Sequence, residues 1–376
     1  MNSVQVSENG RVEQVVPIVL GADPAINWLF IQVVDDAGHI GLGEATLERR
    51  NEQVATLVEA TADAIAGQGL DEALRITAEP ARDLAHAAAL SGLNQALWDL
   101  RARRADQSLS ELISDMAASS PALYANINRA IVGDRSPAAF ARVAQAAQAD
   151  GYSALKIAPF DDVAALPLSD TATRRAVDAG LERITAVLDA VQIEVRVDLH
   201  WRFEVAAAVE VVAELAALPL GWVEAPVREG DLEAWRRVRD STGCVLAGGE
   251  TLTSAAEFDA FLGAARVDIT MPDIKYCGGV SGFRQCLQVS ARHGARVSPH
   301  NPSGPVATLA TLHAAGAAEL HSLEVPWREQ PSPIDVIESG ALVLPTGPGL
   351  GYELPSSAPD RFPAHPEPQA APSDLI

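Results

Sequence analysis

The chain reads IEVRVDLH at residues 193–200, GWVEAP at 221–226 and VLAGGE at 245–250. Each stretch is a short apolar run with a carboxylate at its end, and the carboxylates are Asp198, Glu224 and Glu250. The two intervals are equal, because 224 − 198 and 250 − 224 both come to 26. Such an interval accommodates one strand and one crossover helix, the repeat of a (β/α)₈ barrel, whose chemistry lies at the C-terminal strand ends. A single acid after a strand is usually solvated, but three at one interval predict a shared site.

Three carboxylates from neighbouring strands form an all-oxygen site. Mg²⁺ suits such a site, because it is a hard cation that takes carboxylate ligands and keeps positions open for water or substrate. We therefore predict one Mg²⁺ per subunit, held by the three acids, with Mn²⁺ able to take its place.

Apolar runs and amphipathic helices alternate through the second part of the chain. Eight runs are strand-like: LYANI (123–127), SALKIA (153–158), IEVRVD (193–198), GWVE (221–224), CVLAGG (244–249), VDITMPD (267–273), ARVSPH (295–300) and HSLEV (321–325). Helix-like segments lie between them, for example at residues 136–151, 170–190 and 203–218. This alternation predicts an α/β fold with a closed, TIM-like (β/α)7-8 barrel. A doubly wound open sheet is the alternative, which the missing Gly-rich loop after the first strand disfavours.

Two further segments flank the predicted barrel. Residues 11–50 alternate as strands do, with DDAGH as a hairpin turn, and an Ala-rich helical pattern follows from Asn51. We expect an α+β domain over residues 1–118, the barrel over 119–335, and a C-terminal segment, 336–376, that returns to the first domain. Its GALVLPTGPGLGYEL stretch is expected to pack, whereas the Pro/Ala-rich tail from Ser356 is expected to be flexible.

Composition narrows the function classes. The chain has 376 residues, of which 48% are hydrophobic and 21% charged, as in an ordinary globular protein. No apolar run approaches the ~18 residues of a membrane span. The N-terminus lacks the basic-then-apolar pattern of a signal peptide, so we expect a cytoplasmic protein. A net charge of −22 argues against nucleic acid or an anionic membrane as partner. An anionic substrate stays possible, because a bound divalent cation can dominate the local field.

Other predicted strand ends also carry polar side chains. Lys156 lies in the second run and Glu324 in the eighth, while Asp273 and His300 end the sixth and seventh. A lysine at a strand end is as often a surface residue, but in a barrel mouth either its charge or a lowered pKa becomes useful. An aspartate paired with a histidine orients the ring and raises its basicity, so Asp273 and His300 are candidates for an acid–base pair.

His200 is a further candidate acid or base. It follows Asp198 by two residues, and in an extended segment both side chains point to the same side. A histidine that shares a face with a metal ligand is positioned for proton transfer. The other histidines lie in predicted turns, helices or the tail, and we assign them no role: His39, His86, His293, His313, His321 and His365.

Together these residues resemble the catalytic set of the enolase superfamily, in its mandelate racemase subgroup. The resemblance spans nearly the whole chain, since GLGEATLE (41–48) and GLNQALWDLRAR (92–103) are similar to the family's capping domain. It implies that the three regularly spaced acids are Mg²⁺ ligands. It also implies that Asp273 and His300 form the Asp–His dyad of this subgroup, where muconate-lactonizing enzymes carry a lysine on the sixth strand, and that Glu324 is the acid of the last strand.

One departure from the family pattern bears on the reaction. The second strand often carries Lys-x-Lys, and here it reads Lys156-Ile157-Ala158, so the second base of a racemase is missing. The Asp-x-His arrangement around His200 is instead similar to that of galactonate-type sugar-acid dehydratases. The resemblance thus implies loss of water from a sugar acid to give a 2-keto-3-deoxy acid. His300 would remove the α-proton, His200 would protonate the leaving hydroxyl, and Lys156 with Mg²⁺ would stabilise the enediolate, while Glu324 contacts the carboxylate oxygen.

Two alternatives remain at this point. A cycloisomerase, epimerase or racemase acting on a sugar acid or its lactone could pair His300 with His200 or Lys156 as the second proton carrier. The second alternative is a metal-binding homologue without catalytic activity. The complete set of acids, histidines and lysine argues against this alternative.

The resemblance also implies a small carboxylate substrate, a symmetric homo-oligomer, and capping-domain loops that select the substrate. These loops correspond to about Leu20–Asn27 and Glu48–Asn51. Arginines there either reach a distal polar or anionic group or lie exposed, and aromatic and basic residues near strand ends either line the pocket or pack internally. The candidates for substrate contact are Arg49, Arg50, Trp201, Arg202 and Trp327.

Overall fold

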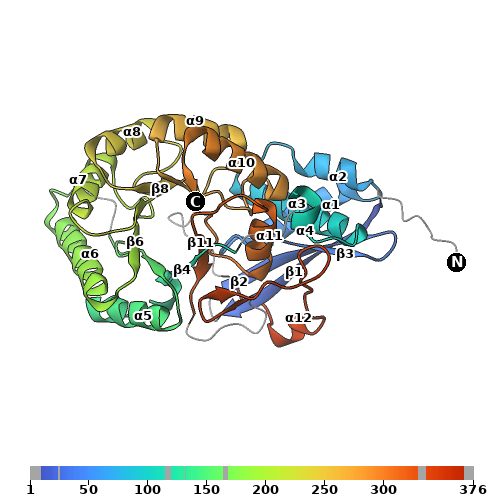
Figure 1. Cartoon of the computed structure of the whole chain (residues 1–376), viewed down its shortest axis with the longest axis horizontal. Coiled ribbons are helices and arrows are strands. Elements are labelled where there is room, and N and C mark those ends of the chain that lie inside the picture. Colours follow the sequence, from blue (N-terminus) through green and yellow to red (C-terminus); the bar gives the residue numbers. More distant parts are fainter. Residues whose placement is uncertain are drawn as a thin grey trace.

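The structure, a computed structural model, describes residues 10–23, 26–114, 120–131, 133–163, 168–328 and 336–367. Figure 1 shows a ring of helices around the strands of the barrel and an α+β part, the capping domain, beside it. The expected boundaries near 118 and 335, part of the Leu20–Asn27 loop, and tail residues 368–376 lie outside the described residues. The domain limits therefore stay predictions.

The capping domain is a three-stranded antiparallel sheet covered by helices, as the alternating and Ala-rich patterns predict. Its elements are β1 (Val12–Asp23), β2 (Ile26–Asp35), β3 (Ile40–Glu44), α1 (Asn51–Ile65), α2 (Leu70–Thr77), α3 (Leu84–Arg104) and α4 (Leu109–Ser114), with strand order β1-β2-β3. The DDAGH turn joins β2 to β3. Asp35 Oδ1 accepts from the backbone N–H groups of Ala37 at 2.9 Å and His39 at 2.8 Å, and Gly38 takes the left-handed φ of 82° that the turn needs.

The barrel contains the eight strands that the sequence predicts, shorter than the apolar runs. They are β4 (Leu123–Asn126), β5 (Ala154–Ile157), β6 (Glu194–Asp198), β7 (Val223–Glu224), β8 (Leu246–Gly248), β9 (Ile269–Thr270), β10 (Arg296–Val297) and β11 (Leu323–Pro326). Neighbouring strands are parallel, in the order β10-β9-β8-β7-β6-β5-β4-β11. The sheet curls until its edges meet, where His321 N donates to Val297 O at 2.7 Å.

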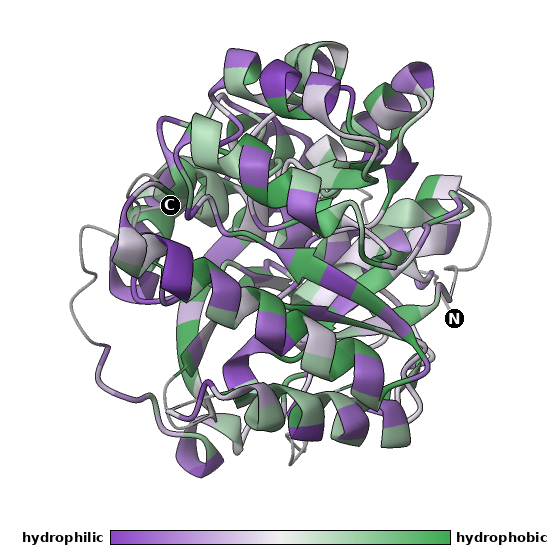
Figure 2. Cartoon of the chain, turned by 90° about the vertical axis from the view of Figure 1, so that its left-hand side faces the viewer, coloured by the Kyte–Doolittle hydropathy of each residue, from purple (hydrophilic) through white to green (hydrophobic). Residues whose placement is uncertain are grey.

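Seven helices follow the first seven barrel strands and cover the outside of the barrel (Figure 1). They are α5 (Pro137–Ala149), α6 (Thr171–Ala190), α7 (Val205–Leu215), α8 (Leu232–Ser241), α9 (Ala255–Ala265), α10 (Gly279–His293) and α11 (Pro305–Ala315). Side-chain oxygens of Ser136, Asp170, Asp231 and Ser254 accept backbone N–H groups at four of the helix starts. Bands of hydrophilic and hydrophobic residues alternate along the helices in Figure 2, as expected for helices with one buried face.

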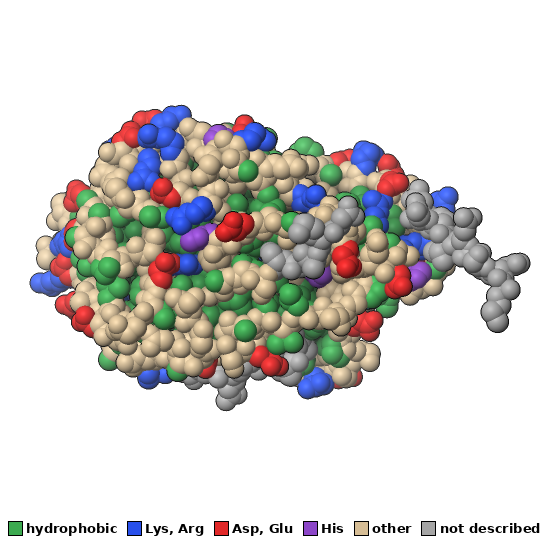
Figure 3. Space-filling model, in the orientation of Figure 1, with side chains coloured by type: hydrophobic (Ala, Val, Ile, Leu, Met, Phe, Trp, Pro, Cys, Tyr) green, Lys and Arg blue, Asp and Glu red, His purple; other side chains and the backbone are tan. Residues whose placement is uncertain are grey.

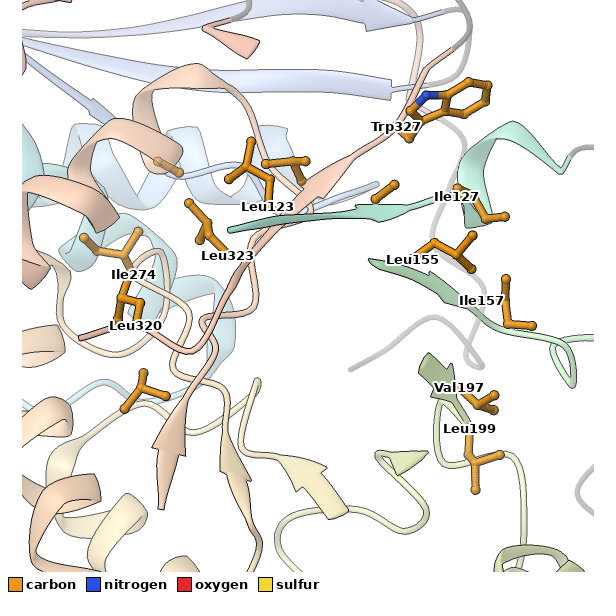
Figure 4. Close-up of a cluster of buried hydrophobic side chains, with 14 of the residues drawn as sticks. Leu123, Ile127, Leu155, Ile157, Val197, Leu199, Ile274, Leu320, Leu323 and Trp327 are labelled. Atoms are coloured by element: carbon orange, nitrogen blue, oxygen red, sulfur yellow. The ribbon is translucent and has the colours of Figure 1, made fainter. Parts of the chain in front are cut away.

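Alternation along the strands decides which side chains reach the barrel interior. Leu155, Ile157 and Val197 belong to the large buried cluster between sheet and helices, and Figure 4 shows them on one side of their strands. Successive strand residues point to opposite faces. Lys156 and Asp198 therefore face the other way, into the barrel. No helix in the described part of the chain is both long and apolar enough to cross a membrane.

The capping domain is joined to the barrel by a buried carboxylate. Glu44 at the end of β3 accepts the N–H groups of Gly304 at 2.8 Å and Ala307 at 2.9 Å, at the start of α11. A carboxylate at a helix N-terminus satisfies unpaired donors and complements the helix dipole. The contact fixes the capping domain next to the loop after His300.

The C-terminal segment packs on the capping domain, and part of the expected flexible tail does so too. After β12 (Ile337–Glu338) and β13 (Ala341–Leu342), Leu350 N donates to Asp99 Oδ1 at 2.6 Å. The tail contains α12 (Ala358–Arg361), and the Asn27 amide exchanges two 2.8 Å hydrogen bonds with the His365 backbone. Part of the expected flexible tail thus contacts residues more than 300 positions away in the chain, and the flexibility of the tail stays a prediction.

Candidate active site

The three regularly spaced acids come together at one end of the barrel. Asp198 and Glu224 are the last residues of β6 and β7 and are paired in register, and Glu250 follows β8 by two residues. One carboxylate oxygen from each lies within 4.8 Å of the others, and all three side chains are buried. The equal spacing in the sequence therefore corresponds to convergence in space.

This arrangement is electrostatically incomplete without a cation. Burial, and then the charge of Asp198, raises the pKa values of Glu224 and Glu250 well above the usual range. Glu250 Oε2 is buried and has no hydrogen-bond partner among the described residues. Three buried carboxylates, one with an oxygen that accepts no hydrogen bond, fit a hard divalent cation, which would offset their repulsion.

Lys156 is a buried ammonium among these acids. Its Nζ lies 2.5 Å from Glu224 Oε1, 3.0 Å from Glu324 Oε1 and 3.5 Å from Asp198 Oδ2. Burial lowers the pKa of Lys156, but Glu224 and Glu324 outweigh this and raise it well above its usual value. Lys156 therefore brings a positive charge to the acidic site, which is one of the two roles that the sequence predicts for it.

His200 lies beside Asp198, but not for the reason that the sequence suggested. The strand ends at Asp198, and His200 and Trp201 have left-handed φ values of 43° and 51°, so the segment is a turn rather than extended. The turn brings His200 Nε2 to 2.9 Å from Asp198 Oδ2 and Nδ1 to 2.7 Å from Asp161 Oδ1. Burial lowers the pKa of His200, but Asp198 and Asp161 outweigh burial and raise it well above its usual value.

Asp273 and His300 form a hydrogen-bonded pair on the opposite part of the barrel mouth from β6. His300 Nδ1 lies 2.8 Å from Asp273 Oδ2, and its Nε2 lies 3.4 Å from Glu250 Oε2. The pair orients the ring so that Nε2 is the nitrogen available at the acidic site. Burial raises the pKa of Asp273, but Lys275 and His300 outweigh it, so the net pKa is lowered and the group is a carboxylate.

Lys275 is a site residue that the sequence analysis missed. Its Nζ donates to Asp273 Oδ2 at 2.5 Å, so the same oxygen accepts from Lys275 and pairs with His300. A signal was present in the sequence, because Lys156 and Lys275 are the only lysines among 28 basic residues. In a chain that otherwise uses arginine, both lysines lie buried at this site.

Glu324 is held in a network behind the lysine. Asn126 Nδ2 donates to Glu324 Oε1 at 2.7 Å, and the Asn301 N–H donates to Oε2 at 3.1 Å. Burial raises the pKa of Glu324, but Lys156 outweighs it and the net pKa is lowered. Glu324 is thus a buried carboxylate that pairs with Lys156 and is attached to the loop that carries His300.

A cavity of about 640 Å³ lies over these groups, between the barrel mouth and the capping domain. Lys156, Asp198, His200, Glu250, Lys275 and His300 line it, and so do the predicted contact residues Arg49, Arg50, Trp201 and Arg202. On the face shown in Figure 3, basic, acidic and histidine side chains gather inside the ring of barrel helices. Two more arginines, Arg129 and Arg228, also line the cavity. They follow strand ends, so the rule that selected Arg202 would have found them.

Trp327 does not belong to this cavity. Its Nε1 donates to Asp150 Oδ2 at 2.7 Å, and the side chain borders a separate, small hollow beside the C-terminal segment. Figure 4 shows it beyond the end of β11. The expectation that Trp327 lines the substrate pocket is therefore corrected, because the side chain is directed outward from the barrel.

Ala158 stands where the family pattern often has the second lysine. Ala158 is buried, its N–H donates to Asn128 Oδ1 at 2.6 Å, and its carbonyl accepts from Arg135 Nη2 at 2.8 Å. The cavity lining holds one lysine besides Lys156. This is Lys275, which follows β9 on the other side of the cavity.

Comparison with known proteins identifies the class. Residues 139–358 match the family model of enolase C-terminal domain-like proteins, and residues 3–114 match the N-terminal domain of mandelate racemase/muconate lactonizing enzymes. The chain belongs to the mandelate racemase/muconate lactonizing enzyme family of the enolase superfamily. The barrel and capping domain that the sequence predicted are thus confirmed, and the chain is an enzyme.

Individual relatives narrow the class further. A D-gluconate dehydratase of Thermoproteus tenax is 30% identical, over 94% of this chain and 74% of its own length. A D-galactonate dehydratase of Ralstonia pickettii is 26% identical, over 87% of this chain and 88% of its own length. A solved enolase-type protein of Agrobacterium radiobacter, described as a putative galactarate dehydratase with bound Na and L-malate, matches with a TM-score of 0.79 and 23% identity. The match covers 94% of this chain and 95% of the Agrobacterium chain. A solved mandelate racemase/muconate lactonizing enzyme of Jannaschia sp. CCS1 matches with a TM-score of 0.81 and 23% identity, over 94% of this chain and 97% of its own length.

Proposed function

We propose that this enzyme removes water from a sugar acid to form a 2-keto-3-deoxy acid. The observation that carries the proposal is the presence of two histidines at one cavity, each paired with its own carboxylate, on either side of the acidic site. His300 pairs with Asp273 and His200 with Asp161. The dehydratase names of the relatives support the same reaction.

The three acids would hold a divalent cation, for which we propose Mg²⁺, with Mn²⁺ as a substitute. When bound, the metal supplies a Lewis acid for the substrate carboxylate. Lys156 adds a fixed positive charge at the same place, since its ammonium lies among Glu224, Glu324 and Asp198. Negative charge that develops on the carboxylate as the α-proton leaves is stabilised by a donor that is already in position.

His300 acts as the base. Its Nδ1 is bound to Asp273, so Nε2 is free to take the α-proton of a substrate held above the acidic site. Asp273 keeps the ring in this tautomer and stabilises the imidazolium that forms. Lys275 holds Asp273 through a 2.5 Å contact and is thereby a positioning residue for the dyad.

His200 acts as the acid. Its ring lies between Asp161 and Asp198 and borders the cavity, and carboxylates at both nitrogens favour the protonated form. The electron pair of the broken C–H bond forms the new C=C bond while the β C–O bond breaks. The proton of His200 joins the departing hydroxyl, which leaves as water. The enol then tautomerises to the 2-keto acid, and the proton taken by His300 balances the one given by His200.

A second reaction is supported by the same pair of histidines. Two proton carriers at one cavity also suit an epimerase, racemase or cycloisomerase acting on a sugar acid or its lactone, with His200 returning a proton to the carbon. The two reactions differ in product mass, because dehydration loses water and isomerisation does not. Mass spectrometry of the products therefore distinguishes them.

The test separates the two histidines in D₂O. His300→Asn should abolish both exchange at the α-carbon and keto-acid formation. His200→Asn should slow keto-acid formation by roughly 10²–10⁴-fold, the usual effect of a positioned acid, while some exchange survives. His293→Asn, at a surface pair with Asp259, is the control and should change neither. Normal dehydration by His200→Asn, or surviving exchange in His300→Asn, would show that the roles are misassigned.

Three further properties stay proposals. We propose a symmetric homo-oligomer, as is common for such barrels, a cytoplasmic location, and no nucleic-acid or membrane partner in view of the net charge of −22. A monomer by light scattering at working concentration would contradict the first.

A further inference from the structure

Five arginines line the cavity above the proposed catalytic residues, and they come from four separate segments. Arg49 and Arg50 follow β3 in the capping domain, Arg129 follows β4, Arg202 follows β6 and Arg228 follows β7. The chain as a whole has a net charge of −22. This concentration of positive charge therefore runs against the composition of the protein.

Among the residues that the structure describes, the lining of the rim holds fewer acids than arginines. Glu48 is shared, because its Oε2 lies 3.0 Å from Arg129 Nη2 and its Oε1 lies 3.8 Å from Arg49 Nε. Arg129 also donates to Pro302 O at 3.0 Å, which holds its guanidinium across the mouth toward the loop after His300. Glu48 thus contacts two guanidinium groups on this side, and Arg49 has a further contact of its own.

The other side of the rim repeats the pattern. Arg202 Nε lies 3.7 Å from Asp161 Oδ1, but that oxygen already pairs with His200 Nδ1 at 2.7 Å. Arg228 forms no ion pair with any residue that the structure describes, and its Cζ lies 5.4 Å from the centre of the Trp201 ring. Within the described lining, Glu48 and Asp161 are the only acids besides the proposed metal ligands, so even without Arg49 four guanidinium groups share the rim with two carboxylates.

The floor and the rim of the cavity can serve different ends of a substrate. The floor, with Lys156 and the three acids, is the place for the carboxylate next to the reacting carbon. A sugar monoacid has no other charge, and its far end would present only neutral hydroxyls to the arginines. A cleft lined by one sign of charge concentrates ligands of the opposite sign, and a guanidinium fork matches a carboxylate with two parallel hydrogen bonds.

We propose that the preferred substrate is a dicarboxylic sugar acid, whose second carboxylate is bound by the arginines of the rim. The proposal rests on the proposed function for the identity of the reacting end. A phosphate at the terminal carbon would offer the same anionic chemistry, and the experiment separates the two sources.

The experiment compares acids that differ only at the terminal carbon. Keto-acid formation is measured with Mg²⁺ for galactarate against galactonate and for glucarate against gluconate, with 6-phosphogluconate as the phosphate probe. We expect kcat/KM to be roughly 10- to 100-fold higher for the diacid of at least one pair, the effect of one or two hydrogen bonds between charged groups. Added NaCl should reduce this preference, because the rim arginines are partly exposed.

Substitutions at the rim locate the effect. Arg228→Gln and Arg49→Gln should each reduce the diacid-to-monoacid ratio of kcat/KM about tenfold, mainly through KM. Arg237→Gln removes an exposed arginine from α8, away from the cavity, and should leave the ratio unchanged. A ratio that none of the rim substitutions alters would overturn the assignment to the arginines.

The outcomes separate this inference from the proposed function. Dehydration of monoacids at equal or higher kcat/KM would overturn the diacid proposal and leave the dehydratase proposal standing. A preference for 6-phosphogluconate over both gluconate and glucarate would overturn the carboxylate in favour of a phosphate. If no acid is dehydrated, the proposed function fails. The diacid proposal is then tested by calorimetry, which measures the binding of galactarate and galactonate to His300→Asn in the presence of Mg²⁺. Tighter binding of galactarate than galactonate supports it, and equal binding overturns it.

Discussion

Replacing Lys156 by Met tests whether the acidic site depends on a fixed positive charge. Met has a similar length and no charge, so the substitution leaves Glu224 and Glu324 without the ammonium that lies 2.5 Å and 3.0 Å from them. Removal of one partner from a buried ion pair costs about 3–5 kcal/mol, because the other charge stays buried. With an unfolding entropy of about 2.1 cal/mol/K per residue, this lowers the melting temperature of a chain of this size by about 4–6 °C.

The decrease in melting temperature caused by Lys156→Met should depend on pH and on bound metal. Burial raises the pKa of Glu224, so at low pH this carboxyl can take up a proton in the variant and the cost decreases. We expect a larger difference in melting temperature at pH 8 than at pH 6 in the presence of a chelator. Added Mg²⁺ should recover part of the loss, because it supplies positive charge to the same carboxylates.

The assay is thermal unfolding followed by circular dichroism, with Arg237→Met as a control for loss of an exposed cation. The control should melt with the wild type. If Lys156→Met melts within about 1 °C of the wild type at pH 8 without metal, the reasoning on a buried, charge-dependent site is refuted.

Three more outcomes can be checked separately. Chelation should abolish activity, and added Mg²⁺ should restore it. Glu224→Gln should weaken Mg²⁺ binding, measured by calorimetry, without unfolding the barrel. Full activity after removal of the metal would contradict the assignment of the metal site. Burial raises the pKa of Asp99 from 3.8 to about 6, so its contribution to stability is present below 3.8 and is lost as pH rises through 6. The melting temperature of the wild type minus that of Asp99→Asn should therefore be larger at pH 5 than at pH 7.5. An equal difference at the two pH values would contradict the raised pKa of Asp99. Lys275→Met should lower kcat and the rate of α-proton exchange together by roughly 10- to 100-fold, the expected effect of a misplaced base. Lys275→Arg should recover part of both. Unchanged exchange in Lys275→Met would show that Lys275 does not position the dyad.

Regular spacing made the barrel and the floor of the site predictable. The intervals of 26 residues from Asp198 to Glu250 follow from one strand and one helix per repeat, and parallel strands end at the same edge. The 27 residues between Asp273 and His300 follow the same rule. Lys156 faces inward because side chains alternate along a strand. These placements depend on local periodicity, which the order of residues along the chain already contains.

Loops beyond the strand ends have no such period, and their side chains were placed by tertiary contacts. His200 reaches Asp161 because the chain turns through left-handed φ values after β6, which no repeat predicts. Trp327 turns outward to Asp150, 177 positions away in the chain.

The sequence by itself therefore determined the fold class, the acidic site and the Asp273–His300 pair, because each depends on spacing within a regular repeat. The tertiary structure decided which loop residues share the cavity, since Arg129, Arg228 and Lys275 meet there only after the barrel has closed. It also placed His365 and Phe362 beside the capping domain, through hydrogen bonds with Asn27 and Gly21. Strand ends mark such residues as candidates, but which of them meet depends on the packing of whole elements.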